Sequence, residues 1–222
     1  MTSRQARRLD YLDAMGVQVW QERGKKPTSL PPLNLSELSS VEDLTALSSV
    51  ANACTRCEAS THRRQAIFGE GARQADWLIV GDYPSEQDDG DGRLFSDGRG
   101  HLLSAMLLAV GTKKADAYLT SSAKCHSKNE TVQSDSLSSC RDILIRQIQL
   151  INPKIILLLG EKAARSVLQS KEGLRELRGN VQTIADINCP IVVTHDLKHL
   201  IEMPLAKKEA WADIQLARHA AE

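Results

Sequence analysis

The sequence predicts an α/β protein of three layers, in which helices cover both faces of a mainly parallel, four-stranded sheet. Two observations support this fold class. Short segments that are almost wholly apolar recur along the chain, and segments of helical length separate them. Unbroken apolar runs are typical of strands that are buried on both faces. A chain of 222 residues can also bury one such core and still carry an N-terminal appendage.

The appendage is a short N-terminal peptide followed by a linker. Within residues 1–24, Leu9, Leu12 and Met15 recur at three-residue steps, which predicts a short helix. Residues 25–39 contain prolines and polar side chains, which predicts a semi-extended linker. A short apolar peptide cannot bury itself. It therefore folds back onto the body or docks on another protein.

The body is expected to span residues 40–222. It begins with a helix at residues 40–53, for which Ser39 and Glu42 form a capping box. Strands and helices then alternate. The expected strands are 77–81, 117–120, 154–160 and 191–194, and the expected helices are 101–110, 137–151, 161–169 and 206–218. Because ligands bind at the carboxyl ends of parallel strands, any chemistry is expected at that edge of the sheet.

The charge of the chain is balanced, with 28 Lys and Arg against 28 Asp and Glu. A protein held on nucleic acid by its bulk field needs a surplus of cations, so we expect weak or no direct DNA binding. No apolar run is long enough to span a membrane, and no signal-peptide pattern is present. Together with five cysteines, this pattern predicts a cytoplasmic protein with free thiols.

Four of these cysteines form an uneven pattern. Cys54 and Cys57 are a Cys-x-x-Cys pair, and Cys125 and Cys140 follow much later with fourteen residues between them. Thiolates select zinc or iron–sulfur clusters. Zinc sites usually use two short pairs, so one pair with two scattered cysteines favours a 4Fe–4S cluster, with zinc as the alternative. The simpler alternative is that the pair packs as small apolar side chains. Cys189 is expected in the core.

Sequence motifs from about residue 51 to 214 resemble the uracil-DNA glycosylase superfamily, specifically its iron–sulfur group, often called family 4. The resemblance implies that Cys54, Cys57, Cys125 and Cys140 are the ligands of the cluster. It also implies the three-layer fold. The matching segments are 54–60, 68–71, 76–84, 92–95, 100–103, 118–120, 124–125, 140, 153–164, 177–179 and 210–213.

The positions that match the family's catalytic residues depart from its pattern in part. Asp82 stands where these enzymes usually have Glu after the first strand, and Phe95 matches the aromatic that stacks on uracil. Ser121 replaces the asparagine that pairs with uracil, and a hydroxyl cannot make both hydrogen bonds of an amide. Asp196 replaces the motif histidine, whereas His195 lies one residue earlier. A carboxylate there would repel the departing uracil anion, and each lost electrostatic contact costs about a hundred- to thousand-fold in rate.

Residues 11–23 are similar to the start of the psi subunit of the bacterial DNA polymerase III clamp loader. Psi proteins are themselves similar to altered members of the glycosylase fold. This resemblance implies that the peptide binds the loader's ATPase subunit, with a Trp anchor, and that the body binds the chi subunit, which contacts single-strand binding protein. The residues expected at the ATPase contact are Leu12, Met15, Val17, Trp20 and Arg23.

Both resemblances together predict a non-catalytic, psi-like accessory subunit of the clamp loader, which retains the glycosylase fold as a binding scaffold. In this hypothesis the catalytic positions are vestigial and the protein is not an enzyme. The alternative is a working uracil-DNA glycosylase of the iron–sulfur type in base-excision repair. A third hypothesis is a redox-sensing cluster protein.

Overall fold

A computed structural model describes residues 38–128 and 130–222 of the chain. The predicted N-terminal peptide, residues 1–24, and nearly all of the predicted linker lie outside the described residues. The domain boundaries therefore stay predictions. Among the helices in the described part of the chain, none has the length and apolar character needed to cross a membrane.

Six strands form one sheet in the order β1-β3-β2-β4-β6-β5. The four inner strands are mutually parallel, which confirms the predicted parallel sheet. The two edge strands pair antiparallel and were not predicted. One is only two residues long, and the other mixes polar and apolar residues without a buried face, so neither gives an apolar run. The strands are β1 (Glu70–Gly71), β2 (Trp77–Gly81), β3 (Tyr118–Ser121), β4 (Ile155–Leu159), β5 (Val181–Ile184) and β6 (Ile187–Thr194).

The expected helices are present, and several short ones join them. The long helix that carries Cys140 begins earlier than the predicted 137–151. The helices are α3 (Leu44–Ala53), α4 (Ala59–His62), α5 (Glu86–Asp91), α6 (Gly98–Ala109), α7 (Glu130–Ile151), α8 (Glu161–Leu168), α9 (Leu174–Leu177), α10 (Leu197–Glu202) and α11 (Lys207–Ala221). Two 3-10 turns, η1 (Lys114–Asp116) and η2 (Pro204–Ala206), complete the set.

The start of α3 differs from the sequence prediction. The expected capping box of Ser39 and Glu42 is wrong, because the helix begins after Asp43. Asp43 is extended, and its carboxylate accepts the first free amides of α3 at 2.7 and 2.8 Å. An aspartate in this position satisfies donors that the helix itself leaves unpaired.

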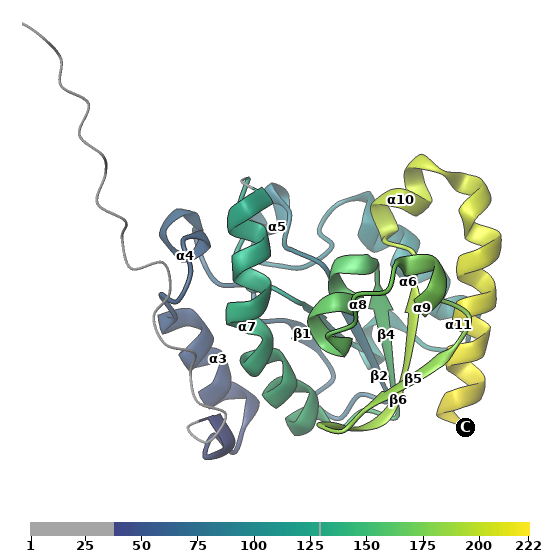
Figure 1. The fold of residues 1–222 in the computed structure, drawn as a ribbon, viewed down its shortest axis with the longest axis horizontal. Coiled ribbons are helices and arrows are strands. Elements are labelled where there is room, and N and C mark those ends of the chain that lie inside the picture. The colour runs from purple at the N-terminus through teal and green to yellow at the C-terminus, as the bar shows by residue number, and fades with distance from the viewer. Residues whose placement is uncertain (1–37, 129) are drawn as a thin grey trace, which may run out of the picture.

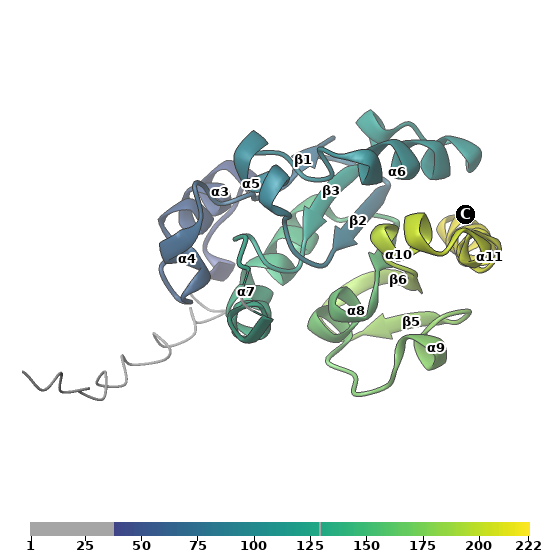
Figure 2. The ribbon, with the colours of Figure 1, turned by 90° about the horizontal axis from the view of Figure 1, so that it is seen from above.

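Alternate residues of each inner strand face opposite helical layers. Leu78 and Val80 of β2 pack with α3, α7 and α8, whereas Trp77 and Ile79 pack with α6 and α11. Figure 1 shows α3 outside α7, and Figure 2 shows α7 and α8 on one side of the sheet with α6 and α11 on the other. The three-layer α/β/α arrangement is thereby confirmed.

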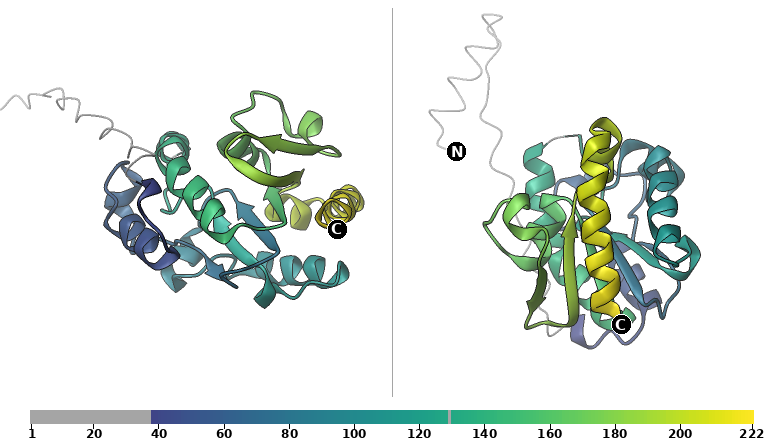
Figure 3. Two further views of the ribbon diagram at one scale, coloured as in Figure 1. Left: turned by 90° about the horizontal axis from the view of Figure 1, so that it is seen from below. Right: turned by 90° about the vertical axis from the view of Figure 1, so that its right-hand side faces the viewer.

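A buried charge network fastens the last helix to the sheet. Figure 3 shows α11 lying along the strands. Asp213 of α11 is 3% exposed, and its Oδ2 accepts from Thr194 Oγ1 of β6 and from Arg178 Nε, each at 2.8 Å. The side chain of Glu209, one helical turn earlier, is 60% exposed and also pairs with Arg178.

We expect Asp213→Ala to lower the free energy of unfolding by about 2–4 kcal/mol, because it leaves the buried Thr194 hydroxyl without its acceptor and removes the buried partner of Arg178. Urea denaturation measures this loss. Glu209→Ala is the matched control and should cost less than about 1 kcal/mol, since exposed ion pairs contribute little. Equal losses in the two variants would contradict a special role for the buried carboxylate.

Candidate active site and thiol centre

Asp82 lies at the carboxyl edge of the sheet, directly after β2. Its Oδ1 accepts the amide of Ala163, in the first turn of α8, at 2.8 Å. Gly160 lies between Asp82 and Asp196: an added Cβ there would be 3.3 Å from both Asp82 carboxylate oxygens and 3.0 Å from Cβ of Asp196. With φ at +94°, this position also has a backbone conformation that favours glycine. The glycine therefore lets the two aspartates approach each other.

The surroundings of Asp82 change its acidity. Burial, together with the nearby carboxylate of Asp196, raises the pKa of Asp82 to about 7. The amide of Ala163 and the ammonium of Lys162 lower the pKa, but by less than burial and Asp196 raise it. A carboxyl with this pKa exchanges protons near neutral pH, which is the property of a general acid or base.

The loop that carries Phe95 brings its ring to the end of β2. Phe95 has φ at +53°, which is uncommon for a residue with a side chain. The tip of its ring lies against Gly81, where an added Cβ would be 2.8 Å from the ring. Gly100 admits the Phe95 carbonyl, since a Cβ there would be 2.1 Å from that oxygen. Arg99 lies 5.9 Å above the ring.

A single buried carboxylate, that of Asp88, holds this loop in place. Asp88 is 1% exposed and accepts from the amide of Ser85, from both the amide and hydroxyl of Ser96, and from Arg99, each at 2.9 Å. The bonds join the turn after Asp82 to the residue after Phe95. Asp88 was not singled out from the sequence, because nothing in its local pattern indicates that it is buried.

The remaining predicted positions do not all face Asp82. Ser121 is buried and its Oγ donates to the carbonyl of Ala123 at 2.7 Å. His195 contacts Glu209 of α11 through Nε2 at 2.9 Å and stacks on His199, with ring centroids 4.9 Å apart. The structure thus gathers Asp82, Phe95 and Asp196 around one strand end, whereas the ring of His195 is engaged by α10 and α11.

Asp196 has a second role in the structure. It is the N-cap of α10, and its Oδ2 accepts from the amides of Lys198 and His199 at 3.1 and 3.4 Å. Its carboxylate is therefore fixed by the helix and at the same time raises the pKa of Asp82.

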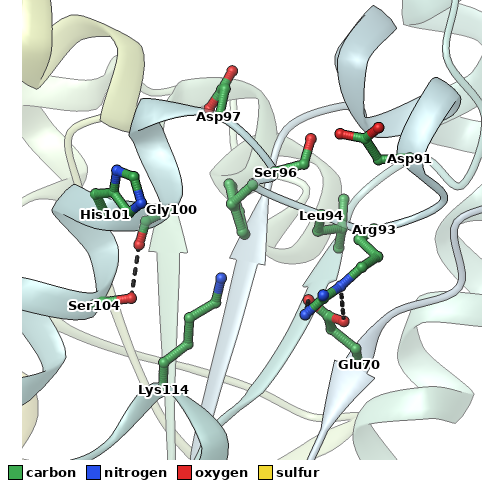
Figure 4. A pocket seen from close by; sticks show the side chains of 11 residues that line it. Glu70, Asp91, Arg93, Leu94, Ser96, Asp97, Gly100, His101, Ser104 and Lys114 are labelled. Carbon is green, nitrogen blue, oxygen red and sulfur yellow. Dashed lines mark hydrogen bonds and ion pairs between the residues drawn. The ribbon is translucent and has the colours of Figure 1, made fainter.

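A cavity of about 390 Å³ adjoins the Phe95 loop, between α6, η1 and the edge of the sheet. Figure 4 shows Lys114 pointing into it, with His101 and Ser104 of α6 on one side and the Arg93–Glu70 ion pair on the other. Phe95 forms part of its wall, and the tip of its ring lies against Gly81 at the end of β2.

The four predicted ligand cysteines lie around the middle of α7, which packs against α3 and α4. Cys54 caps α3, Cys57 precedes α4, Cys125 follows β3, and Cys140 lies within α7. Cys57 and Cys125 share a hydrogen bond, which lowers the pKa of the Cys57 thiol. Burial, together with the charges of Cys57 and Cys54, raises the pKa of Cys140 to about 11.

Two basic residues, Arg63 and Lys124, contact these thiols, which the sequence analysis did not predict. Arg63 Nη1 donates to Cys125 Sγ at 2.9 Å and to the carbonyl of Ala51, while its Nη2 donates to the carbonyl of Cys54. Lys124 donates its backbone amide to Cys140. The local sequence around Arg63 and Lys124 does not indicate these contacts, because they join segments that are far apart in the chain.

The chemistry of the donor set suits a thiolate-bound metal centre, since four cysteines lie in one region of the fold with the Arg63 guanidinium and the Lys124 amide as donors to sulfur. In residues 38–128 and 130–222, no three Cys, His, Asp or Glu side chains are spaced as ligands around one point. The four cysteines therefore fit a metal centre by the chemistry of their side chains and not by a ligand geometry. The alternative, that the Cys-x-x-Cys pair packs merely as apolar side chains, does not account for the charges beside it.

Comparison with known proteins places this site in a family. Residues 68–215 match the Uracil DNA glycosylase superfamily, and the chain belongs to it. A Type-4 uracil-DNA glycosylase of Pyrobaculum aerophilum is 26% identical over 181 residues, which is 78% of this chain and 92% of the relative. A protein with the same description from Thermotoga maritima is 32% identical over 129 residues, covering 57% of this chain and 67% of the relative. A third, from Sulfurisphaera tokodaii, is 34% identical over 122 residues, covering 54% of this chain and 55% of the relative.

These comparisons show that the predicted psi-like clamp-loader function is wrong. The curated relatives, matched over much of the body, are described as uracil-DNA glycosylases. The N-terminal match is confined to residues 11–23, and together with three altered side chains it does not outweigh a family match over residues 68–215. The residues of that match lie outside the described part of the chain. The expected contacts with the ATPase subunit, chi and single-strand binding protein are therefore untested.

We expect Asp82→Asn to stabilise the protein progressively as the pH rises from about 4 to 7. The folded-state pKa is about 7 and the unfolded value about 4. The free energy of unfolding of the wild type therefore falls as the pH rises between these two values, and Asp82 has no such effect below pH 4. The gain at pH 8 should be about 3–4 kcal/mol, because each unit of the pKa difference contributes about 1.4 kcal/mol.

Urea unfolding of both proteins across this pH range measures the effect. Asp76→Asn, which removes an exposed carboxylate just before β2, is the matched control. A difference between wild type and Asp82→Asn that stays constant with pH would refute the raised pKa.

Proposed function

We propose that the protein is a DNA glycosylase that removes uracil from DNA and acts in base-excision repair. The observation that carries this proposal is the placement of Asp82, a carboxyl with a pKa of about 7 at the carboxyl edge of the sheet, beside Phe95. The likeness to proteins described as Type-4 uracil-DNA glycosylases supports it. Such an enzyme extrudes its target base from the stack and reads it in a pocket.

In this proposal ionised Asp82 accepts a proton from the attacking water. The Ala163 amide orients the carboxylate, and Asp196 keeps its pKa near the working pH. A base with such a pKa combines a useful ionised fraction with a strong tendency to accept the proton. Lys162, whose charge acts on Asp82 and whose Nζ lies 5.0 Å above the Tyr83 ring, supplies positive charge at the edge where the uracil anion departs.

We also propose that Cys54, Cys57, Cys125 and Cys140 hold a 4Fe–4S cluster. The convergence of four thiols beside Arg63 supports this cofactor. The cluster would tie α3, the loop after β3, and α7 together, so that its binding energy contributes to folding.

Wild-type protein should excise uracil from a single-stranded oligonucleotide, measured as alkali-labile abasic sites. Asp82→Asn should reduce the rate about a hundred-fold or more, because it removes the base. The wild-type rate should rise with pH through about 7 as Asp82 ionises. Asp76→Asn should retain the wild-type rate. A wild type that leaves uracil in place, or Asp82→Asn that cleaves normally, would remove the proposal.

Purified wild-type protein should contain iron and sulfide and absorb visible light. Cys125→Ser should lose both and unfold at lower temperature, because a metal centre that joins distant segments stabilises the fold. Cys189→Ser, which changes the cysteine outside this set, should keep the iron. Colourless protein with one zinc per chain would show that the cofactor proposal is wrong.

A further inference from the structure

The cavity of about 390 Å³ beside the Phe95 loop has no role in the proposed excision of uracil. Neither Asp82 nor Asp196 is among the residues that line it. Its walls come from α6, from η1, from β1 and from the segment between α5 and α6. Its volume lies in the range of pockets that hold small molecules, roughly 300–1,000 Å³.

Two of the carboxylates on these walls are already paired. That of Glu70 accepts from Arg93 Nε at 3.0 Å and from Nη2 at 3.5 Å. That of Asp97 accepts from Arg99 Nε at 2.8 Å and also from the Arg99 amide, as the N-cap of α6. In the part of the chain that the structure describes, Nη1 of Arg93 has no acceptor, so it remains a donor for a ligand.

Lys114 and Asp91 are the unpaired charges of this cavity. Among residues 38–128 and 130–222, neither side chain forms a hydrogen bond or an ion pair. The ammonium of Lys114 lies beside the first turn of α6, where a Cβ added at Gly100 would be 3.4 Å from Nζ. Figure 4 shows Lys114 directed into the cavity and Asp91 on the opposite side of it.

The two charges define the kind of ligand that fits. The ammonium of Lys114 donates to anionic oxygens, with Arg93 Nη1 as a second donor on the same walls, whereas the carboxylate of Asp91 only accepts. A complementary ligand therefore has an anionic group at one end and an N–H donor at the other. A nucleotide has both groups, since its phosphate is anionic and the edge of its base carries N–H donors.

We propose that this cavity is a nucleotide-binding site, separate from the base site at Asp82, in which Lys114 binds the phosphate and Asp91 accepts an N–H of the base. The nucleotide is one unit of a DNA strand or a free mononucleotide, because both carry these groups. Phe95 forms part of the wall while the tip of its ring lies against Gly81, so an occupant contacts the loop that also shapes the candidate active site.

Titration calorimetry with the full-length protein tests the site. The probe is deoxyadenosine monophosphate, whose base has an amino group and is not uracil, and deoxyadenosine is the matched ligand without the phosphate. Wild type should bind the monophosphate about ten-fold more tightly or more, because hydrogen bonds to charged groups are strong. Lys114→Met and Lys114→Gln should abolish this difference by weakening the monophosphate alone.

Two further variants locate the contacts. Lys113→Met removes the neighbouring exposed lysine, which does not line the cavity, and should leave both affinities unchanged. Asp91→Ala should weaken the monophosphate about three- to ten-fold, as expected for one hydrogen bond, and should leave the binding of inorganic phosphate unchanged. Wild type that does not bind the monophosphate, Lys114 variants that bind it normally, or inorganic phosphate that binds as tightly would each overturn the proposal.

A uracil-free, single-stranded oligonucleotide distinguishes the two sources of the nucleotide. If the site holds a unit of the strand, the monophosphate competes with the oligonucleotide and Lys114→Met weakens both. If it holds a free mononucleotide, the oligonucleotide is neither displaced nor weakened. These measurements involve no excision. Protein that removes uracil but fails the binding test refutes this inference alone, whereas protein that binds through Lys114 and leaves uracil in place refutes the glycosylase activity alone.

Discussion

The hydrogen bond from the Ala163 amide to Asp82 is the constraint on which the candidate active site depends. It joins the end of β2 to the start of α8, and it is possible because β2 and β4 are parallel neighbours that end at the same edge. Gly160 leaves the space through which this contact is made. Burial at this strand end, together with the nearby carboxylate of Asp196, raises the pKa of Asp82 to about 7. Packing of the backbone thus determines the acidity of the site.

A second constraint sets the position of Phe95. Its backbone adopts a conformation with positive φ, which costs about 1 kcal/mol or more for such a residue. The four hydrogen bonds accepted by Asp88 offset this cost by fixing both ends of the loop. The ring is therefore held against Gly81 before any base arrives, which reduces the ordering that binding requires.

The thiol centre and the candidate active site share one segment of chain. Lys124 binds the carbonyl of Ser121, and His126 contacts the carbonyl of Pro84 at 2.9 Å, so the residues on either side of Cys125 support the ends of both β3 and β2. A cluster bound at Cys125 would order this segment. The proposed cluster and the proposed base-binding site would in this way be mechanically connected.

The sequence by itself determined the layered fold, because buried parallel strands are apolar throughout and leave a strong local pattern. It also identified the cysteines that converge, since a Cys-x-x-Cys pair is readable from spacing. Edge strands β1 and β5 were missed, because edge strands need no such pattern.

The roles of individual charged residues were decided only by the tertiary structure. Burial of Asp88 and Lys124, and the turn of His195 toward Glu209, depend on contacts between segments far apart in the chain. Charged residues are usually exposed, so composition gives no warning when one is buried. The functional inference failed for the related reason that three altered side chains were judged without their surroundings. Asp82 acquires its acidity from neighbours that only folding brings to it.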